Sequence, residues 1–292
     1  MINFLNARRR PRGFTLVEMV IVIVITGIIG AMVAVFIRVP VQGYIDTTAR
    51  AALADTADTA ARRLTRDVRL ALPNSVRVSN DGLFLELLLT KTGGRYLSDS
   101  DPGVPGNVLS FESPPSSPSF TVVGAMPADA LGARQAISVG DQIVVYNLGT
   151  EYAPNNAYAC SAANGCNRAP VTAVSGTLVT LGSYPFATAP APLPSPSNRF
   201  QVVTTPVTYA CNLTTGTLTR YAGYAIQATQ PVVADLKDGA LLARQVTACV
   251  FSYTVLANVQ RGLVNIDLSL GAANSNTGVL RLVQQVQARN TP

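Results

Sequence analysis

The sequence contains no histidine. This absence excludes Ser-His-Asp and Cys-His nucleophiles, a histidine general base and histidine ligands for zinc. P-loop and G-x-G-x-x-G motifs are also absent, and the sixteen acidic residues are dispersed along the chain. Asp99 and Asp101 share a Pro/Gly-rich loop, but without the ligand ladder of an EF-hand they favour a solvated loop over a calcium site. We therefore predict a protein that is not an enzyme, with no catalytic residue, metal or cofactor.

Lysine is also scarce, because 20 of the 22 basic residues are arginine. The net charge is +6, but Arg8, Arg9, Arg10 and Arg12 stand in an acid-free N-terminal stretch, so the remainder carries only +2. The arginines after Arg77 are scattered singly, and neither a basic stripe nor an arginine-aromatic platform is visible in the sequence. We therefore expect no nucleic-acid partner, and a role in DNA uptake remains an unsupported alternative.

An apolar run follows the arginines. Residues 14–37 are 24 residues with one ionisable side chain, Glu18. As a helix this run would span roughly 36 Å, which is enough to cross a bilayer once. The arginine asymmetry predicts a cytoplasmic N-terminus and an exported remainder. A cleaved Sec signal peptide is the alternative, but the run is too long for a typical signal core and has no clean small-x-small cleavage site at its end.

Glu18 distinguishes this run from an ordinary anchor. An unpaired carboxylate inside an apolar membrane helix costs about 2 to 3 kcal/mol, so a cationic partner is expected. If the chain is cut after Gly13, the new amino group of Phe14 supplies a cation at the same depth. The amine of a neighbouring copy would reach Glu18 with better geometry than its own. The alternative is that Glu18 reaches the cytoplasmic interface and has no role.

The residues from Arg12 to Glu18 (Arg-Gly-Phe-Thr-Leu-Val-Glu) resemble the class III prepilin motif of type IV pilin-like proteins. The resemblance implies that prepilin peptidase cuts after Gly13, that Phe14 becomes the N-methylated terminus, and that Glu18 serves in subunit docking. It also implies major pilin, other minor pilin-like subunits and an inner-membrane assembly platform as partners. The implied location is the inner membrane, with a single span and a periplasmic head, and then the pilus tip.

The helical pattern continues beyond the membrane run. Pro40 is expected to kink or locally melt the helix, and Pro73 with Asn74 to stop it. Apolar residues recur at three- and four-residue spacing and predict one core-facing stripe, formed by Leu53, Ala57, Ala60, Leu64, Val68 and Ala71. The opposite face carries charges, with Asp58 and Arg62 in the favourable i,i+4 order, and is read most simply as solvated.

After Pro73 the pattern changes to short β-rich runs separated by turn residues, which predicts a mainly antiparallel sheet. The predicted strands are 83–89, 108–111, 120–123, 142–146, 171–174, 177–181, 199–204, 207–211, 217–221, 246–254, 263–270 and 279–287. The fold class is therefore α+β, a long N-terminal helix packed on a β head. We divide the chain into a leader (1–13), a transmembrane helix half (14–39), an amphipathic helix half (40–72) and a periplasmic head (73–292).

Two segments of the head, 98–119 and 184–198, are rich in Pro, Ser and Gly and are predicted to be irregular. They are either mobile surface loops or arms that contact partners.

All four cysteines lie in the exported part, where disulfides persist. Three pairings are possible; we favour Cys160 with Cys166, across a short loop, and Cys211 with Cys249, which each lie in a strand-like run. In the chain-entropy model these bonds contribute roughly 2 and 4 kcal/mol. A zinc site at Cys160 and Cys166 is the disfavoured alternative.

Scattered stretches of the head also resemble the O-type biogenesis proteins of MSHA pili and the J-type pseudopilins of type II secretion. They lie at residues 65–77, 241–253 and 262–264. This resemblance implies a low-copy subunit at or near a filament tip, where minor pilins initiate assembly. Because Glu18 is retained, we expect a position beside or below the extreme cap. A type II secretion pseudopilin and a pilus-tip adhesin or other ligand-binding module remain the alternatives.

Overall fold

The computed structural model describes residues 13–101, 103–126, 135–256, 261–271 and 278–292. Of the predicted leader, only Gly13 is among them, so the four leader arginines lie outside the described residues. The chain forms two compact units, divided between Ala51 and Ala52. The boundary falls within the predicted amphipathic helix half, and each unit is described by itself below.

One long helix, α1 (Leu16–Arg69), contributes to both units. It is helical through Pro40, where the sequence predicted a kink or local melting, and local melting is wrong. Proline lacks one backbone donor, but its fixed φ is compatible with a helix, so one lost hydrogen bond does not end the helix here.

The helix ends at Arg69, four residues before Pro73, which is earlier than predicted. The chain leaves the helix to pair with a strand: Leu72 N–H donates to Leu88 O at 2.8 Å, and Ala71 forms a bridge with Leu89. Asn74 then takes a left-handed conformation with φ 58°, which asparagine tolerates better than most residues. Sheet pairing therefore ends the helix before proline can.

Among its described residues, the second unit contains a sheet of nine strands in the order β1-β2-β3-β6-β5-β4-β7-β8-β9 and a sheet of three, β10-β11-β12. All of the strand pairings are antiparallel. The bounds are β1 Arg77–Val78, β2 Phe84–Tyr96, β3 Ser119–Val123, β4 Gln142–Val145, β5 Arg168–Ser175, β6 Leu178–Leu181, β7 Arg199–Asn212, β8 Thr217–Ala222, β9 Ala240–Arg244, β10 Val246–Leu256, β11 Arg261–Leu270 and β12 Leu280–Arg289, with a 3-10 turn at Val233–Asp235. The predicted α+β class, one long apolar N-terminal helix with a mainly antiparallel β domain, is confirmed.

Several strand predictions differ in detail. The strand predicted at 108–111 is wrong: Leu109 is buried, but its N–H donates to Leu97 O at 2.9 Å from an irregular loop. The two strands predicted at 199–204 and 207–211 are one strand, β7, which continues through Pro206. β1 and β9 were not predicted. Apolar content alone does not distinguish a buried loop from a strand, because both bury their side chains.

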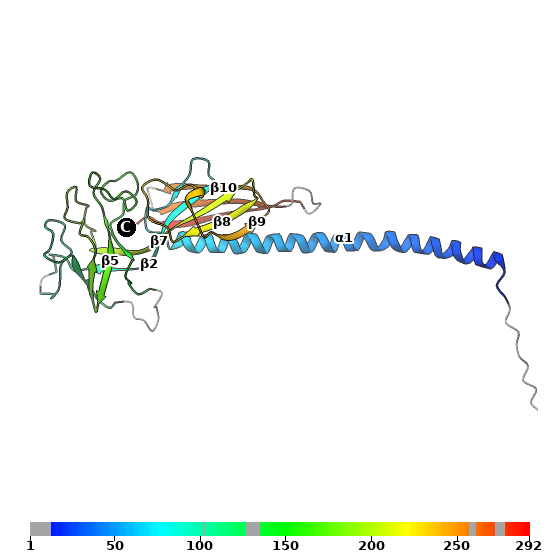
Figure 1. Cartoon of the computed structure of the whole chain (residues 1–292), viewed down its shortest axis with the longest axis horizontal. Helices are drawn as coiled ribbons and strands as arrows, with labels where there is room; N and C mark the ends of the chain where they lie inside the picture. Colours follow the sequence, from blue (N-terminus) through cyan, green and yellow to red (C-terminus); the bar gives the residue numbers. More distant parts are fainter. Residues whose placement is uncertain (1–12, 102, 127–134, 257–260, 272–277) are drawn as a thin grey trace, which may run out of the picture. The chain divides into compact units, whose positions relative to one another are not determined.

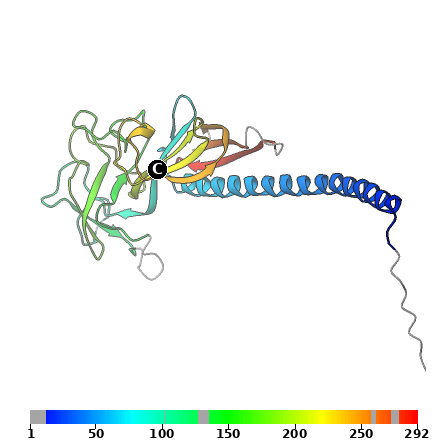
Figure 2. The ribbon, with the colours of Figure 1, turned by 45° about the vertical axis from the view of Figure 1, so that its right-hand side comes forward.

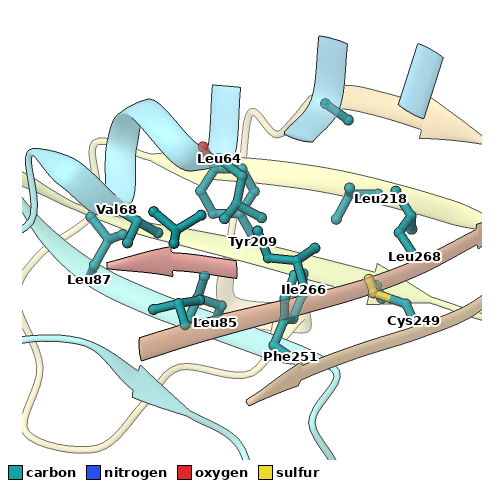
Figure 3. Close-up of a cluster of buried hydrophobic side chains, with 14 of the residues drawn as sticks. Leu64, Val68, Leu85, Leu87, Tyr209, Leu218, Cys249, Phe251, Ile266 and Leu268 are labelled. Carbon is teal, nitrogen blue, oxygen red and sulfur yellow. A yellow bond between two sulfur atoms is a disulfide. The ribbon is translucent and has the colours of Figure 1, made fainter. Parts of the chain in front are cut away.

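The core of the second unit begins at the C-terminal end of α1, which lies beside β8 and β9 (Figures 1 and 2). Ala57, Ala60, Leu64, Val68 and Ala71 are buried, and Leu53 packs against them, so the predicted apolar stripe is confirmed. Figure 3 shows Leu64 and Val68 above Tyr209 and Leu87 of the nine-stranded sheet. Residues of β10 and β11 close the same cluster from the other side, among them Phe251, Ile266 and Leu268.

A second cluster lies farther along the head, around Phe120, Phe186 and Phe200. Phe186 comes from the Pro-rich segment 184–198 and is fully buried, while Tyr184 of the same segment donates its hydroxyl to Ser110 O at 3.0 Å. The Asn155 side chain also binds both the N–H and the carbonyl of Leu193. This segment is irregular, as predicted, but it is packed onto the head by side chains rather than held only at its ends.

Candidate functional site

The Gly13–Phe14 peptide bond lies outside the helix, which begins three residues after Gly13. Nothing approaches within 4 Å of the position a Gly13 side chain would occupy. The Phe14 side chain is 74% exposed. In the part of the chain that the structure describes, this peptide bond is therefore accessible to an enzyme that binds its substrate as extended backbone.

Thr15 and Glu18 build the first turn of α1. Glu18 N–H donates to Thr15 Oγ1 at 3.3 Å, and Met19 N–H donates to Thr15 O at 3.2 Å. Thr15 is therefore the N-cap, and Glu18 stands three residues later, the spacing of a capping box. A carboxylate in this turn also interacts favourably with the positive end of the helix dipole. Glu18 thus has a local structural role that the sequence analysis did not consider.

Glu18 has no cationic partner among the described residues, and its side chain is exposed. Its surroundings along the helix are apolar. The hydrogen bond to Thr15 uses the backbone N–H of Glu18 and does not supply a counter-charge for the Glu18 carboxylate. The carboxylate is therefore left available for a cation from outside this part of the chain.

The first unit buries almost none of its apolar side chains. Those between Phe14 and Ile37 are exposed, and the most apolar 18-residue window of α1 has a mean hydropathy of 3.0 with none of it buried. Within the described residues, α1 is the helix that is long and apolar enough to cross a membrane. A continuous apolar surface of this kind is stable only when lipid or other protein covers it.

In the second unit, Asp67 fastens the end of α1 to the nine-stranded sheet. Its carboxylate is buried, accepts a hydrogen bond from the Tyr209 hydroxyl at 2.8 Å, and pairs with Arg220 Nε at 2.7 Å. Arg63 and Arg66 lie at 3.8 and 4.0 Å from the same carboxylate. Burial, and then the nearby carboxylate, raise the pKa of Tyr209 well above its ordinary value. This contact was not predicted, because Asp67 lies among charged residues that suggest a solvated face.

A second buried carboxylate, Glu86 of β2, pairs with Arg77 Nε at 2.7 Å and accepts a hydrogen bond from Tyr224 at 3.0 Å. The Arg77 guanidinium also lies 3.8 Å from the centre of the Tyr158 ring, a cation-π geometry. Burial raises the pKa of Glu86 in spite of the arginine. The group links β1, β2 and two loops, and so has a structural role.

The four cysteines form two disulfides, Cys160–Cys166 and Cys211–Cys249, which are the two pairs favoured from the sequence. Cys160 and Cys166 close a short loop, in which Ser161 and Gly165 form a bridge. Cys211 lies in β7 and Cys249 in β10, so the second bond joins the nine-stranded sheet to the three-stranded one. Both cysteines of this bond are buried in the same core as the apolar stripe of α1, and Figure 3 shows Cys249 there.

Asp101 has a structural explanation in its own loop. It pairs with Arg95 and accepts hydrogen bonds from the Ser98 N–H at 3.1 Å and the Ser98 hydroxyl at 2.9 Å. These bonds hold the pKa of Asp101 below its ordinary value. In the described residues, no three His, Cys, Asp or Glu side chains gather as metal ligands would.

Comparison with known proteins gives one finding. Residues 8–34 match the family model of the prokaryotic N-terminal methylation motif. No curated protein and no solved structure matches the chain significantly. The motif covers the junction that contains Gly13, Phe14 and Glu18, together with most of the apolar run. The match supports a type IV pilin-like N-terminal region.

Proposed function

We propose that this chain is a minor pilin or pseudopilin subunit that takes part in the initiation and assembly of a type IV pilus. Prepilin peptidase cuts it after Gly13, Phe14 becomes the N-methylated terminus, and Glu18 docks against the amine of another pilin-like chain. The observation that carries the proposal is the methylation motif at the start of a helix whose apolar surface is uncovered. Glu18, with no cationic partner in the described residues, supplies the docking charge.

The finer assignment is to an MSHA-like pilus, at or near the tip. A head of two sheets and two disulfides suits a low-copy subunit with partners of several kinds, and the retained Glu18 suits a place beside or below the extreme cap. The proposed partners are major pilin, other minor subunits and the inner-membrane assembly platform. We also propose the four-part division into leader, transmembrane half, amphipathic half and periplasmic head, with the N-terminus in the cytoplasm.

The proposal is tested in cells with three variants. Gly13→Ala is expected to leave the full-length chain uncut, because prepilin peptidase cuts the motif between glycine and phenylalanine. Glu18→Ala is expected to be cut normally but to be absent from filaments. Gly27→Ala is the matched control for processing: it makes the same substitution inside the apolar run, away from the proposed cleavage site, so this variant should be cut like the wild type. Immunoblots give chain length, and purified filaments give incorporation.

A mature-length product from Gly13→Ala would remove the processing assignment, and normal incorporation of Glu18→Ala would remove the docking role. A secretion pseudopilin is distinguished by deleting the gene and measuring pilus number and protein secretion separately. Lost secretion with normal piliation would contradict the pilus assignment. Normal piliation with lost adhesion would instead favour a ligand-binding module over initiation.

A further inference from the structure

Four arginines that are far apart in the sequence gather on the surface of the second unit. Arg69 ends α1, Arg199 begins β7, Arg261 begins β11 and Arg289 ends β12, and all four line one hollow of about 590 Å³. A neighbouring hollow of about 730 Å³ shares Arg69, Arg261 and Arg289. We call the two hollows together the arginine groove.

The positive charge of the groove is not balanced by acids. Neither hollow is lined by a described Asp or Glu, and the arginines have no ion pair in the described part of the chain; Arg261 donates only to the neutral Gln287 Oε1, at 3.0 Å. Lys91 also lines the groove, but Asp141 neutralises it at 2.6 Å. On the same strand as Arg289, Arg281 lies outside the groove and pairs with Asp267. Of these two arginines of β12, the one outside the groove has an acidic partner, and the one in the groove has none in the described residues.

The register of the sheet makes this arrangement unfavourable for the fold. Arg261 and Arg289 are direct cross-strand partners of β11 and β12, so two like charges face each other on one side of the sheet. Directly opposed like charges destabilise a sheet. A local rule that is broken with no compensating contact in the structure is expected at a functional site.

The chemistry of the lining distinguishes between anionic partners. Guanidinium groups bind carboxylates through two parallel hydrogen bonds, and the other polar groups of the groove are hydroxyls and amides. No aromatic residue lines either hollow, so the groove has no platform on which nucleic-acid bases would stack. Of the apolar residues that line the two hollows, Leu70 is exposed and suits an apolar side chain of a peptide, whereas the others are buried in the head; those are Ala71, Pro73, Val286 and Ala288.

We propose that the arginine groove binds an acidic segment of a partner polypeptide through its carboxylates. This goes beyond the proposed function and does not depend on processing or on Glu18. The sequence analysis missed it because each arginine stands alone in the chain. The fold supplies the site by bringing the ends of one helix and three strands together.

The test uses the purified full-length protein in detergent and a fluorescent peptide that alternates glutamate and alanine. Fluorescence anisotropy is expected to give saturable binding that weakens with added salt. The double variant Arg199→Gln/Arg289→Gln should bind about tenfold more weakly, as expected for the loss of two partly exposed ion pairs. Arg199→Lys keeps the charge but loses the planar guanidinium group, so its affinity for the peptide should lie between those of the wild type and the double variant.

Arg281→Gln is the matched control, because it removes one positive charge from the same strand outside the groove. Equal weakening in this control would overturn the proposal, because binding would then follow net charge alone. Single-stranded oligodeoxynucleotide binding more tightly than the peptide, or inorganic phosphate competing as well as the peptide at equal concentration, would also overturn it. The thermal midpoint of the double variant should not be lowered, since it loses an arginine from an unfavourable pair; weaker binding with a lowered midpoint would count against the groove.

Discussion

At the scale of the residue, the buried carboxylates Asp67 and Glu86 pair within the head, whereas Glu18 has no cationic partner in the described residues. Asp67 and Glu86 each have an arginine and a tyrosine hydroxyl as partners, so burial leaves neither carboxylate alone. An unpaired buried carboxylate would cost several kcal/mol, or would take up a proton. Glu18, which is exposed on α1, has no such partner among the described residues. Side chains of one chemical type therefore have different roles according to their burial.

The role of Asp67 leads to a prediction about stability. Asp67→Asn keeps the shape of the side chain but removes the charge that faces Arg220 and Tyr209. We expect the free energy of unfolding to fall by about 2 kcal/mol, the range for a hydrogen bond to a charged group. Asp58→Asn is the control, because the pair of Asp58 with Arg62 is exposed and should contribute little to the free energy of unfolding. Urea unfolding followed by circular dichroism measures both; equal losses would contradict the proposed fastening role of Asp67.

The buried tyrosines predict a loss of stability at alkaline pH. Burial raises the pKa of Tyr184 from its ordinary value of 10.0 to about 12. Between these values the unfolded chain has lost the proton that the folded chain keeps, so the free energy of unfolding falls as pH rises. The stabilisation is complete below pH 10 and is lost as pH rises through 12.

Tyr184→Phe should therefore show a shallower loss of stability between pH 10 and 12, as measured by urea titrations at several pH values. The decline should not disappear, because burial also raises the pKa of Tyr209 and Tyr224. Tyr152→Phe is the control, since the Tyr152 side chain is 60% exposed, and it should keep the slope of the wild type. An unchanged slope in Tyr184→Phe would refute this explanation.

At the scale of the element, α1 has two different kinds of surface. Its N-terminal part presents apolar side chains all round, which suits lipid or the core of a filament. Beyond Ala52 it presents one apolar stripe to the sheet and charges on the other side. Periodicity in the sequence predicts both, because helix faces follow from residue spacing alone. Strand ends are harder to predict, because they depend on which partner strand is available.

The two disulfides act at this scale: Cys211–Cys249 joins β7 to β10, and Cys160–Cys166 closes a short loop between β4 and β5. Replacing Cys211 and Cys249 by alanine should lower the free energy of unfolding by about 4 kcal/mol, and replacing Cys160 and Cys166 by about 2 kcal/mol. The difference follows from the sequence separations, 38 against 6 residues, since a longer closed loop restricts the unfolded chain more. Urea unfolding without reductant compares the two double variants. A larger loss for the shorter loop would show that native-state contacts outweigh loop entropy.

At the scale of the whole molecule, we expect the uneven distribution of charge to determine on which side of a membrane the head lies. The first 13 residues carry four arginines and no acid, and Arg38 alone follows the apolar run. Positive residues are retained on the cytoplasmic side, so we expect the head to be exported. Protease added to spheroplasts should therefore degrade the head, as followed with an antibody against it.

The matched variant has glutamine in place of the four leader arginines. In the same assay, the head should be protected from protease in a fraction of its molecules. A cytoplasmic protein that remains intact shows that the inner membrane is sealed. A wild-type head that resists protease in spheroplasts, but not after detergent is added, would show that the orientation is the reverse.

The sequence by itself determined the features that depend on neighbouring residues. Three of these features depend on consecutive or regularly spaced positions. They are the junction from Arg12 to Glu18, the apolar run, and the stripe from Ala57 to Val68. The α+β class follows from the change of period after Pro73. The favoured cysteine pairs came from their loop and strand contexts, and the structure joins the same pairs.

Only the tertiary structure decided which distant residues meet. Tyr209 and Arg220 lie 142 and 153 positions from Asp67, and no local pattern identifies them as its partners. The arginine groove likewise depends on the register of β11 with β12 and on where α1 and β7 lie beside them. Burial of the whole core fixes the strand register and the helix packing. The core therefore decides which surface residues lie side by side. The residues next to an exposed arginine in the sequence do not predict which distant residues lie beside it in the fold.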